Sequence, residues 1–245
     1  SIHSTLTLGE FLSKKYFSNF FINHYILPMA SAIWSSSYIN ILDFPLVSFL
    51  RFFDNHGLLS VANQPQWRTI KNGSQSYVSK LVKGISGKCY LNSPIKKVIR
   101  NRFNVTLIFE DGSNREYDRV IFATHADQTI KLIDNPTNEE RKQFSKWSYS
   151  KNHTSLHHDA SILPPNREAW ASWNSTRFNE NSHDENVGVS YYMNRLHNIS
   201  NEIPYIVSLN SKAHINPTSV LFDTTYEHPL FNFDSIKSQQ HLPSL

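Results

Sequence analysis

Two short segments of the chain combine residue types that can bind an anionic ligand. Gly73-Ser74 follows a turn at Asn72 and opens a helix, so its backbone amides could lie near a phosphate. Ala123-Thr124-His125 ends an apolar run from Val120, and strands of an α/β sheet normally present their carboxyl ends to the ligand. Both segments also have a purely structural explanation, a capped turn and a helix N-cap. From the residues alone, the capped turn is the better explanation of Gly73-Ser74.

Three aromatic side chains, Trp67, Trp173 and Tyr191, are candidates for lining a substrate cavity. Aromatic rings offer large apolar contact areas, although aromatics on alternating strands are more often ordinary core. The sequence contains no G-x-S-x-G motif and no recognisable Ser-His-Asp or Cys-His arrangement. These residues therefore indicate a cavity without a nucleophile or an acid–base dyad.

A cluster of His153, His157, His158 and Asp159 invites comparison with a metal site. On a strand, His157 and Asp159 would share one face. No further ligands follow at a known metal-binding spacing, so we expect no metal. Cys89 is the only cysteine, which excludes an intramolecular disulfide and favours a reducing, cytoplasmic setting.

The first quarter of the chain, which must position part of this chemistry, is expected to be helical. Thr7 and Glu10 form a capping-box pattern, and Pro28 and Pro45 can each open a further helix, the last ending at Gly57. The apolar faces expected on these helices are Leu8, Phe11, Leu12 and Tyr16, then Met29 to Trp34, then Leu46, Phe49, Leu50 and Phe53.

The rest of the chain is expected to alternate between strands and turns. Asn72-Gly73 and Asp111-Gly112 are turn signals, a helix is expected from Ser74 to Ile85, and Thr124 is expected to cap another helix. The apolar run Val120–Ala123 is typical of a strand buried on both faces. The other predicted strands are Trp67–Ile70, Cys89–Leu91, Ile95–Arg100, Val105–Phe109, Glu116–Tyr117, Ser148–His157, Glu168–Trp173, Val187–Met193, Tyr205–Leu209 and Val220–Tyr226.

Composition and glycine spacing limit the function classes. Lys and Arg are dispersed despite the net charge of +4, so we expect no nucleic-acid partner, and no apolar run is long enough for a transmembrane segment. None of the seven glycines are spaced as G-x-G-x-x-G, the pattern that lets a backbone approach a dinucleotide pyrophosphate. Because that pattern is missing, we expect the chain to be a fragment of a longer protein.

The order and spacing of several segments resemble the flavin-containing amine oxidoreductase superfamily. Within it, the chain is most similar to bacterial FAD-dependent amine oxidase-like proteins. No single motif carries the resemblance, which covers nearly the whole chain. The segments that carry it are Phe53–Leu59, Pro65–Ile70, Gly73–Val78, Val120–Asp127, Leu156–Asp159, Ala169–Asn174, Ser190–Asn194 and Tyr226–Phe231.

This resemblance implies an α/β or mixed α+β fold, with a β-meander, a second mixed sheet and a helical cap, and FAD as the cofactor. It implies FAD contacts at Gly73, Ser74, Ile95 and the segment Ala123-Thr124-His125. The chain departs from the family pattern because it lacks the opening G-x-G-x-x-G and the closing glycine-rich flavin segment. We therefore expect that this chain alone does not hold FAD tightly.

The resemblance implies four segments, although no clear linker separates them. Residues 1–60 would form a helical cap of the substrate domain and 61–147 part of the FAD-binding domain. Residues 148–231 would form the substrate-domain sheet, and 232–245 the start of the C-terminal flavin-binding segment. We also expect residues 6–59 and 148–209 to enclose an apolar cavity, and Ala123-Thr124-His125 to lie nearer the flavin than the His157–Asp159 cluster does.

Three functions are compatible with these observations. The first is an FAD-dependent oxidoreductase acting on an apolar or amine-bearing small molecule or lipid. The second is a non-catalytic remnant, or one half of a split flavoprotein that needs a partner chain carrying the dinucleotide-binding part. The third is a lipid-binding module without redox chemistry.

Overall fold

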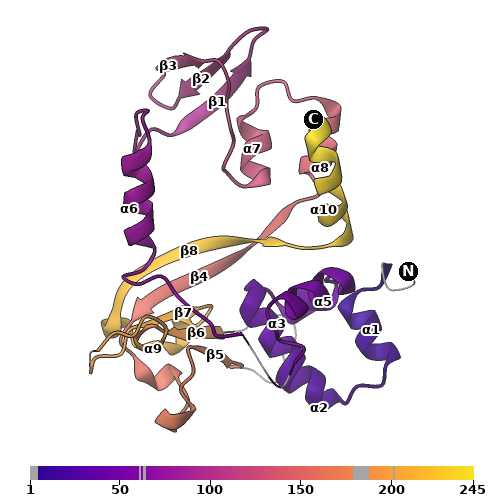
Figure 1. The fold of residues 1–245 in the computed structure, drawn as a ribbon, viewed down its shortest axis with the longest axis vertical. Coiled ribbons are helices and arrows are strands. Elements are labelled where there is room, and N and C mark those ends of the chain that lie inside the picture. Colours follow the sequence, from indigo (N-terminus) through magenta and orange to yellow (C-terminus); the bar gives the residue numbers. More distant parts are fainter. Residues whose placement is uncertain (1–4, 61, 63–64, 179–187, 201) are drawn as a thin grey trace. The chain divides into compact units, whose positions relative to one another are not determined.

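The computed structural model describes residues 5–60, 62, 65–178, 188–200 and 202–245. The chain divides into two compact units (Figure 1). The helix–sheet unit comprises Ser1–Tyr77 and Tyr149–Asn232, and the meander unit comprises Val78–Ser148 and Phe233–Leu245. Helices and antiparallel strands occur in both, so the predicted mixed α and β fold class is confirmed.

The helix–sheet unit begins with the predicted capping box. Thr7 Oγ1 accepts a hydrogen bond from the Glu10 amide at 3.1 Å, and Glu10 Oε2 accepts one from the Thr7 amide at 2.9 Å. The helix ends at Lys14, so Tyr16 does not share its face as predicted and is 95% exposed. The helical elements here are α1 (Leu8–Lys14), α2 (Asn19–Phe21), the π-helical turn η2 (Ile22–Ile26), α3 (Leu27–Trp34), α4 (Tyr38–Leu42) and α5 (Leu46–Asn55).

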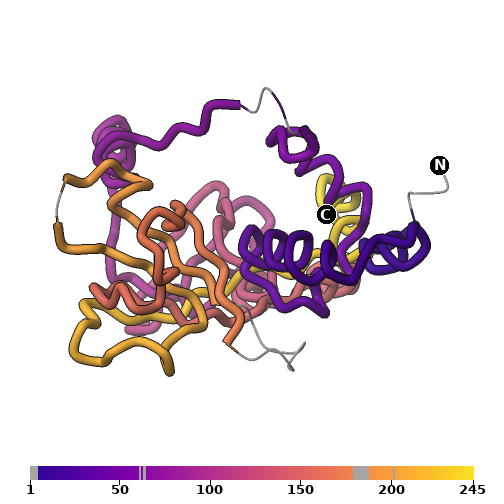
Figure 2. The backbone as a smooth tube through the Cα atoms, turned by 90° about the horizontal axis from the view of Figure 1, so that it is seen from below, coloured from indigo at the N-terminus to yellow at the C-terminus, as the bar shows by residue number. Residues whose placement is uncertain are grey.

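Helices α1 to α5 gather around one apolar core beside strands β5–β7 (Figures 1 and 2). Pro45 is the N-cap of α5, and Gly57, with φ of +67°, follows the helix end as predicted. Helix α4 was not predicted. The buried apolar residues of this core are Leu8, Leu12, Ile26, Leu27, Ala30, Tyr38, Ile41, Phe44, Leu46, Phe49 and Phe53.

A five-stranded sheet in the order β5-β6-β7-β4-β8 completes this unit, with β6 antiparallel to both β5 and β7 and β4 antiparallel to β7. Four of its strands, β4, β6, β7 and β8, lie close to the predicted positions. Val187, the first residue of one predicted strand, lies outside the described residues. The strand predicted at Glu168–Trp173 is wrong because a 3₁₀ turn occupies Arg167–Ala169. The strands are β4 (Ser148–His157), β5 (Trp173–Thr176), β6 (Gly188–Tyr192), β7 (Ile206–Leu209) and β8 (Val220–Leu230).

Short helical turns connect these strands. Asp159 and Asn216 each cap a 3₁₀ turn with a side-chain oxygen. These turns are η3 (Ala160–Ile162), η4 (Arg167–Ala169), α9 (Met193–Leu196), η5 (Lys212–His214) and η6 (Pro217–Ser219). One of them, η3, contributes Ile162 to a small buried cluster with Leu163, Ile206 and Ile215.

The meander unit is built on an antiparallel sheet in the order β1-β2-β3, as the alternating pattern predicts. Its core contains Val98, Leu107 and Phe109. Arg100 on β1 forms a paired hydrogen bond with the buried Glu140 carboxylate of α8, at 2.5 and 2.9 Å. The elements are β1 (Ile95–Arg100), β2 (Val105–Phe109), β3 (Asn114–Tyr117), α7 (Ala126–Leu132), α8 (Asn138–Phe144), α10 (Phe233–Ser238) and η7 (Gln239–Ser244), and α6 (Ser74–Gly84) runs from one unit into the other.

Three further predicted strands do not form. Val120–Ala123 has no regular secondary structure and pairs with no described strand, and Ile121 is 91% exposed. A strand exists only where a neighbouring backbone accepts its hydrogen bonds, so an apolar run alone does not suffice. Trp67–Ile70 and Cys89–Leu91 are also irregular. No helix among the described residues has the length and apolar character needed to cross a membrane.

Candidate functional site

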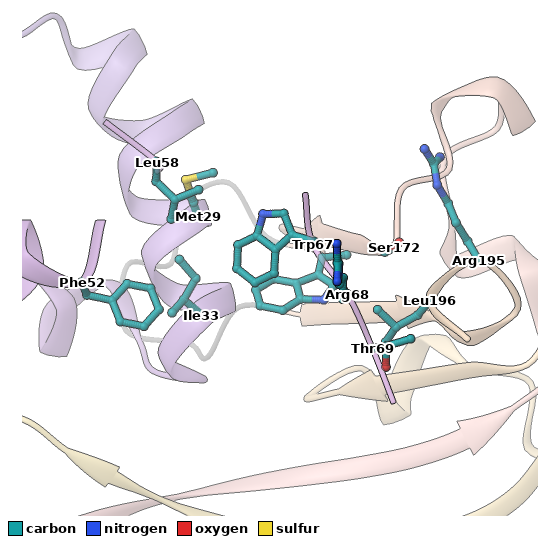
Figure 3. Close-up of a pocket in the computed structure, with 11 residues that line it drawn as sticks. Met29, Ile33, Phe52, Leu58, Trp67, Arg68, Thr69, Ser172, Arg195 and Leu196 are labelled. Atoms are coloured by element: carbon teal, nitrogen blue, oxygen red, sulfur yellow. The ribbon is translucent and has the colours of Figure 1, made fainter. Parts of the chain in front are cut away.

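A largely apolar cavity of about 490 Å³ lies within the helix–sheet unit. Small-molecule pockets typically measure about 300–1,000 Å³. Helices α3 and α5 and the loop after α5 supply one wall, and the segment 65–70, the start of β5 and the turn α9 supply the other (Figure 3). The lining residues are Met29, Ile33, Phe52, Leu58, Trp67, Arg68, Thr69, Ser172, Trp173, Arg195 and Leu196.

Two of the three residues predicted to line a substrate cavity, Trp67 and Trp173, line this one. Tyr191 lies behind it. It pairs with Trp173 across β5 and β6, and the two rings meet edge to face with centroids 5.7 Å apart. Burial raises the pKa of the Tyr191 phenol, and its hydrogen bond to the Ser35 side chain opposes that shift. The Tyr191 phenol therefore stays neutral, and its ring packs against Trp173.

An aromatic stack leads from the helical core to the cavity. The Phe52 and His56 rings stack at 3.9 Å, and His56 stacks on Trp67 at 5.8 Å. His56 Nδ1 lies 2.7 Å from the Phe52 carbonyl, so Nδ1 carries the proton and donates it to that oxygen. Phe52 and His56 were not predicted as part of the site, although both lie in or beside a segment that carries the family resemblance.

The polar part of the lining is basic. Arg68, Arg195, Thr69 and Ser172 line the cavity, and among the residues that the structure describes no Asp or Glu does. Arg195 Nη1 donates a hydrogen bond to the Trp170 carbonyl at 2.5 Å. The side chain of Arg68 forms no hydrogen bond or ion pair with any residue that the structure describes. No sequence pattern pointed to the two arginines, because they come from segments more than a hundred residues apart.

A smaller cavity of about 390 Å³ contains two of the predicted cofactor residues, Gly73 and Ser74. Gly73 has φ of +73°, and a Cβ placed there would meet no atom within 4 Å. The backbone at the start of α6 is therefore open to close approach by a ligand, which fits a phosphate group of FAD. Nothing in this segment reproduces the cradle of amides that a G-x-G-x-x-G loop supplies. Arg68 also lines this cavity.

The remaining predicted cofactor residues belong to the meander unit. Ile95 begins β1 and pairs with Phe109. Ala123 and Thr124 are exposed, and His125, not Thr124 as predicted, is the N-cap residue of α7. Thr124 Oγ1 instead lies 2.8 Å from Thr129 Oγ1. The predicted cofactor residues are thus divided between the two units.

The histidine cluster on β4 forms a structural network. His157 is fully buried, its Nε2 lies 2.8 Å from Ser208 Oγ, and its Nδ1 accepts a hydrogen bond from the Asp159 amide at 3.1 Å. Burial lowers the pKa of His157, which keeps the imidazole neutral. Within the described part of the chain, no group of three or more His, Cys, Asp or Glu residues could hold a metal ion.

Comparison with known proteins assigns the family. Residues 1–183 match the model of the flavin containing amine oxidoreductase family. The chain belongs to this family, and FAD is the cofactor that the family uses. A search of curated proteins found no match.

Solved structures share the fold at low sequence identity. A putrescine oxidase variant has a TM-score of 0.59 at 15% identity, covering 85% of this chain and 45% of the oxidase. A fatty acid isomerase from P. acnes has a TM-score of 0.59 at 15% identity, with coverage of 94% and 56%. Cyclohexylamine oxidase from Brevibacterium oxydans IH-35A has a TM-score of 0.57 at 7% identity, with coverage of 92% and 54%. The chain thus spans about half the length of these structures.

Proposed function

We propose that this chain is the substrate-binding part of an FAD-dependent oxidoreductase that acts on an apolar small molecule or lipid. The observation that carries the proposal is the apolar cavity of the helix–sheet unit, in a chain of a flavin-dependent family. The fold is shared with proteins named for oxidation of putrescine and cyclohexylamine and for isomerisation of a fatty acid. Those names cover polar amines and lipids alike, so they do not select one substrate.

In this proposal the cofactor supplies the redox chemistry and the chain supplies position and shielding. Trp67 and Trp173 contact the substrate and exclude water, while Gly73 and Ser74 contact a phosphate group of FAD. Ile95 and the segment 123–125 complete the FAD contacts. The domain roles follow the expected boundaries except at Trp67, Arg68 and Thr69, which line the substrate cavity: residues 1–60 and 148–231 bind substrate, and the rest of 61–147 and residues 232–245 belong to the FAD-binding part.

The described residues offer no side-chain pair for acid–base catalysis in the cavity. Its hydroxyl groups, from Thr69 and Ser172, are available to orient a polar substituent. His56 lies behind Trp67, with Nδ1 bound to the Phe52 carbonyl. The chain therefore contributes orientation, desolvation and electrostatic selection, which suffices where a flavin performs the bond-breaking step.

The second candidate is one half of a split flavoprotein that needs a partner chain. The observation that favours it is apolar surface in the region proposed to bind FAD. Leu81 and Ile85, on or just after α6, are 65% and 53% exposed, and Ile121 is 91% exposed. Large apolar side chains exposed to this extent favour a surface that another element covers. A partner carrying the dinucleotide-binding part would cover them.

The test is a visible absorption spectrum of the intact protein that carries this chain, purified from its source organism. An oxidised-flavin band that bleaches under anaerobic conditions on adding an apolar substrate supports the oxidoreductase. Substitution Trp67→Ala should slow that bleaching by about tenfold or more, whereas Phe222→Ala, at an exposed aromatic outside the cavity, should not. Binding of the apolar compound without any flavin would instead support a lipid-binding module.

A further inference from the structure

We propose that the cavity of the helix–sheet unit selects an apolar compound that carries an oxyanion head group, and discriminates against a cationic amine. The inference deepens the proposed function, because it names the substrate class of the same cavity. It depends on which charged groups line the cavity and on how far their hydrogen-bonding capacity is already used.

The helical wall of the cavity selects the apolar part of the ligand. Met29, Ile33, Phe52 and Leu58 contribute only apolar atoms, and all four are half-buried (Figure 3). A hydrocarbon chain or ring that covers them is removed from water together with them, which favours binding. None of the described residues on this wall is charged, so the wall matches the apolar part of the ligand and not its head group.

The opposite wall of the cavity selects the charge of the head group. Arg195 uses one donor on the Trp170 carbonyl, and Arg68 uses none on any described residue. A guanidinium is planar and presents paired N–H donors that match the two oxygens of a carboxylate or phosphate. Figure 3 shows Arg68 beside Trp67, with Arg195 on the far side of the cavity from Phe52. An amphiphile can therefore place its oxyanion at the arginines and its apolar part against the helices.

A cationic amine lacks a complement in this cavity. The strongest partner for an ammonium group is a carboxylate, and no Asp or Glu stands among the described residues that line the cavity. The faces of Trp67 and Trp173 attract cations weakly at exposed positions, and both rings are partly exposed. Arg68 and Arg195 repel an ammonium at the same wall, so the charge pattern favours the anion.

The 245-residue chain without cofactor is titrated calorimetrically with decanoate, decyl phosphate, decanol and decylamine, each below its micelle-forming concentration. We expect at least one of the two anions to bind about tenfold or more tightly than both decanol and decylamine. The tighter anion identifies the head group as carboxylate or phosphate. Arg68→Ala should abolish this preference by lowering the affinity for the tighter anion to about the affinity for decanol, and Arg68→Lys should keep part of it.

The matched control is Arg51→Ala, which removes the same charge from an exposed arginine of α5 outside the cavity. It should leave the preference for anions intact, and circular dichroism should show that each variant is folded. If decanol or decylamine binds as tightly as both anions, or if Arg51→Ala lowers anion affinity as much as Arg68→Ala, the inference is wrong while the cavity remains a substrate site. If none of the four compounds binds, both the inference and the proposed function lose their support.

Discussion

At the scale of single residues, the buried polar network around His157 has a measurable consequence. His157 is fully buried, and both of its ring nitrogens are hydrogen-bonded. Nδ1 accepts a hydrogen bond from the Asp159 amide, so in the neutral ring Nε2 carries the proton and donates it to Ser208 Oγ. Burial lowers the pKa of His157 below the ordinary value of 6.5, and repulsion from His158 adds to this, while Asp159 and Asp223 oppose it. The folded chain therefore resists a proton that the unfolded chain accepts.

This difference predicts loss of stability in acid. Because the folded pKa is depressed, the stabilising contribution is complete above the unfolded pKa of about 6.5 and is lost as the pH falls below it. We expect the free energy of unfolding in urea to fall between pH 7.5 and pH 5. His157→Gln should cost about 1–3 kcal/mol at pH 7.5, because it disturbs buried hydrogen bonds, but should flatten this pH dependence.

The control for this prediction is His241→Gln, at an exposed histidine near the end of the chain. It should change neither the stability at pH 7.5 nor its pH dependence. If His157→Gln retains the full slope of the parent chain, the acid sensitivity arises elsewhere and His157 is not its source.

At the scale of elements, the helices and turns that depend on local signals could be predicted from the sequence. The capping box of α1 and the end of α5 at Gly57 each depend on a few adjacent residues. The hairpin of β2 and β3 turns at the predicted Asp111-Gly112. Such signals act through neighbouring backbone groups and need no distant partner.

The elements that failed depend on residues elsewhere in the chain. Val120–Ala123 has the composition of a buried strand, but its state depends on a neighbouring strand to which it could bond. Arg68 and Arg195 line the same cavity only because of the tertiary fold, so no local sequence pattern predicted them. By contrast, Trp67 and Trp173 were found because large aromatics carry a signal by type alone.

The end of helix α5 provides the prediction at this scale. Gly57 has φ of +67°, and a Cβ added there would lie 2.4 Å from Pro65 Cδ. Gly57→Ala should therefore destabilise the chain by about 1–3 kcal/mol, since both the backbone and the loop to Pro65 must shift. Because Leu58 and Trp67 lie next to these positions and line the cavity, binding of decanol should also weaken.

Gly84→Ala is the matched control, because a Cβ there meets nothing within 4 Å and its φ is not in the left-handed region. Urea unfolding should show a change within about 0.5 kcal/mol for this variant. Equal losses for the two substitutions would mean that the close approach of Gly57 to Pro65 does not hold the loop in place.

At the scale of the whole molecule, the chain combines a well-packed helical core with a less buried meander unit. The helix–sheet unit buries a continuous set of large apolar side chains around Phe49 and Phe53, whereas α6 contains no buried residue. The chain also spans only about half the length of the structures that share its fold. The substrate side of the proposed enzyme is thus better formed within these 245 residues than the cofactor side.

The last prediction follows from this imbalance: the 245-residue chain alone does not hold FAD tightly. A pyrophosphate is normally bound by several backbone amides at a helix N-terminus, and this sequence has no G-x-G-x-x-G loop to provide them. Gly73 and Ser74 at the start of α6 could contact one phosphate group. Losing even two charge-assisted hydrogen bonds of about 1.5–3 kcal/mol each weakens binding by about a hundredfold or more. The purified chain should therefore be colourless and show weak FAD uptake in calorimetry, while circular dichroism shows it folded. A yellow preparation with close to one flavin per chain would contradict this and would place a complete FAD site within these residues.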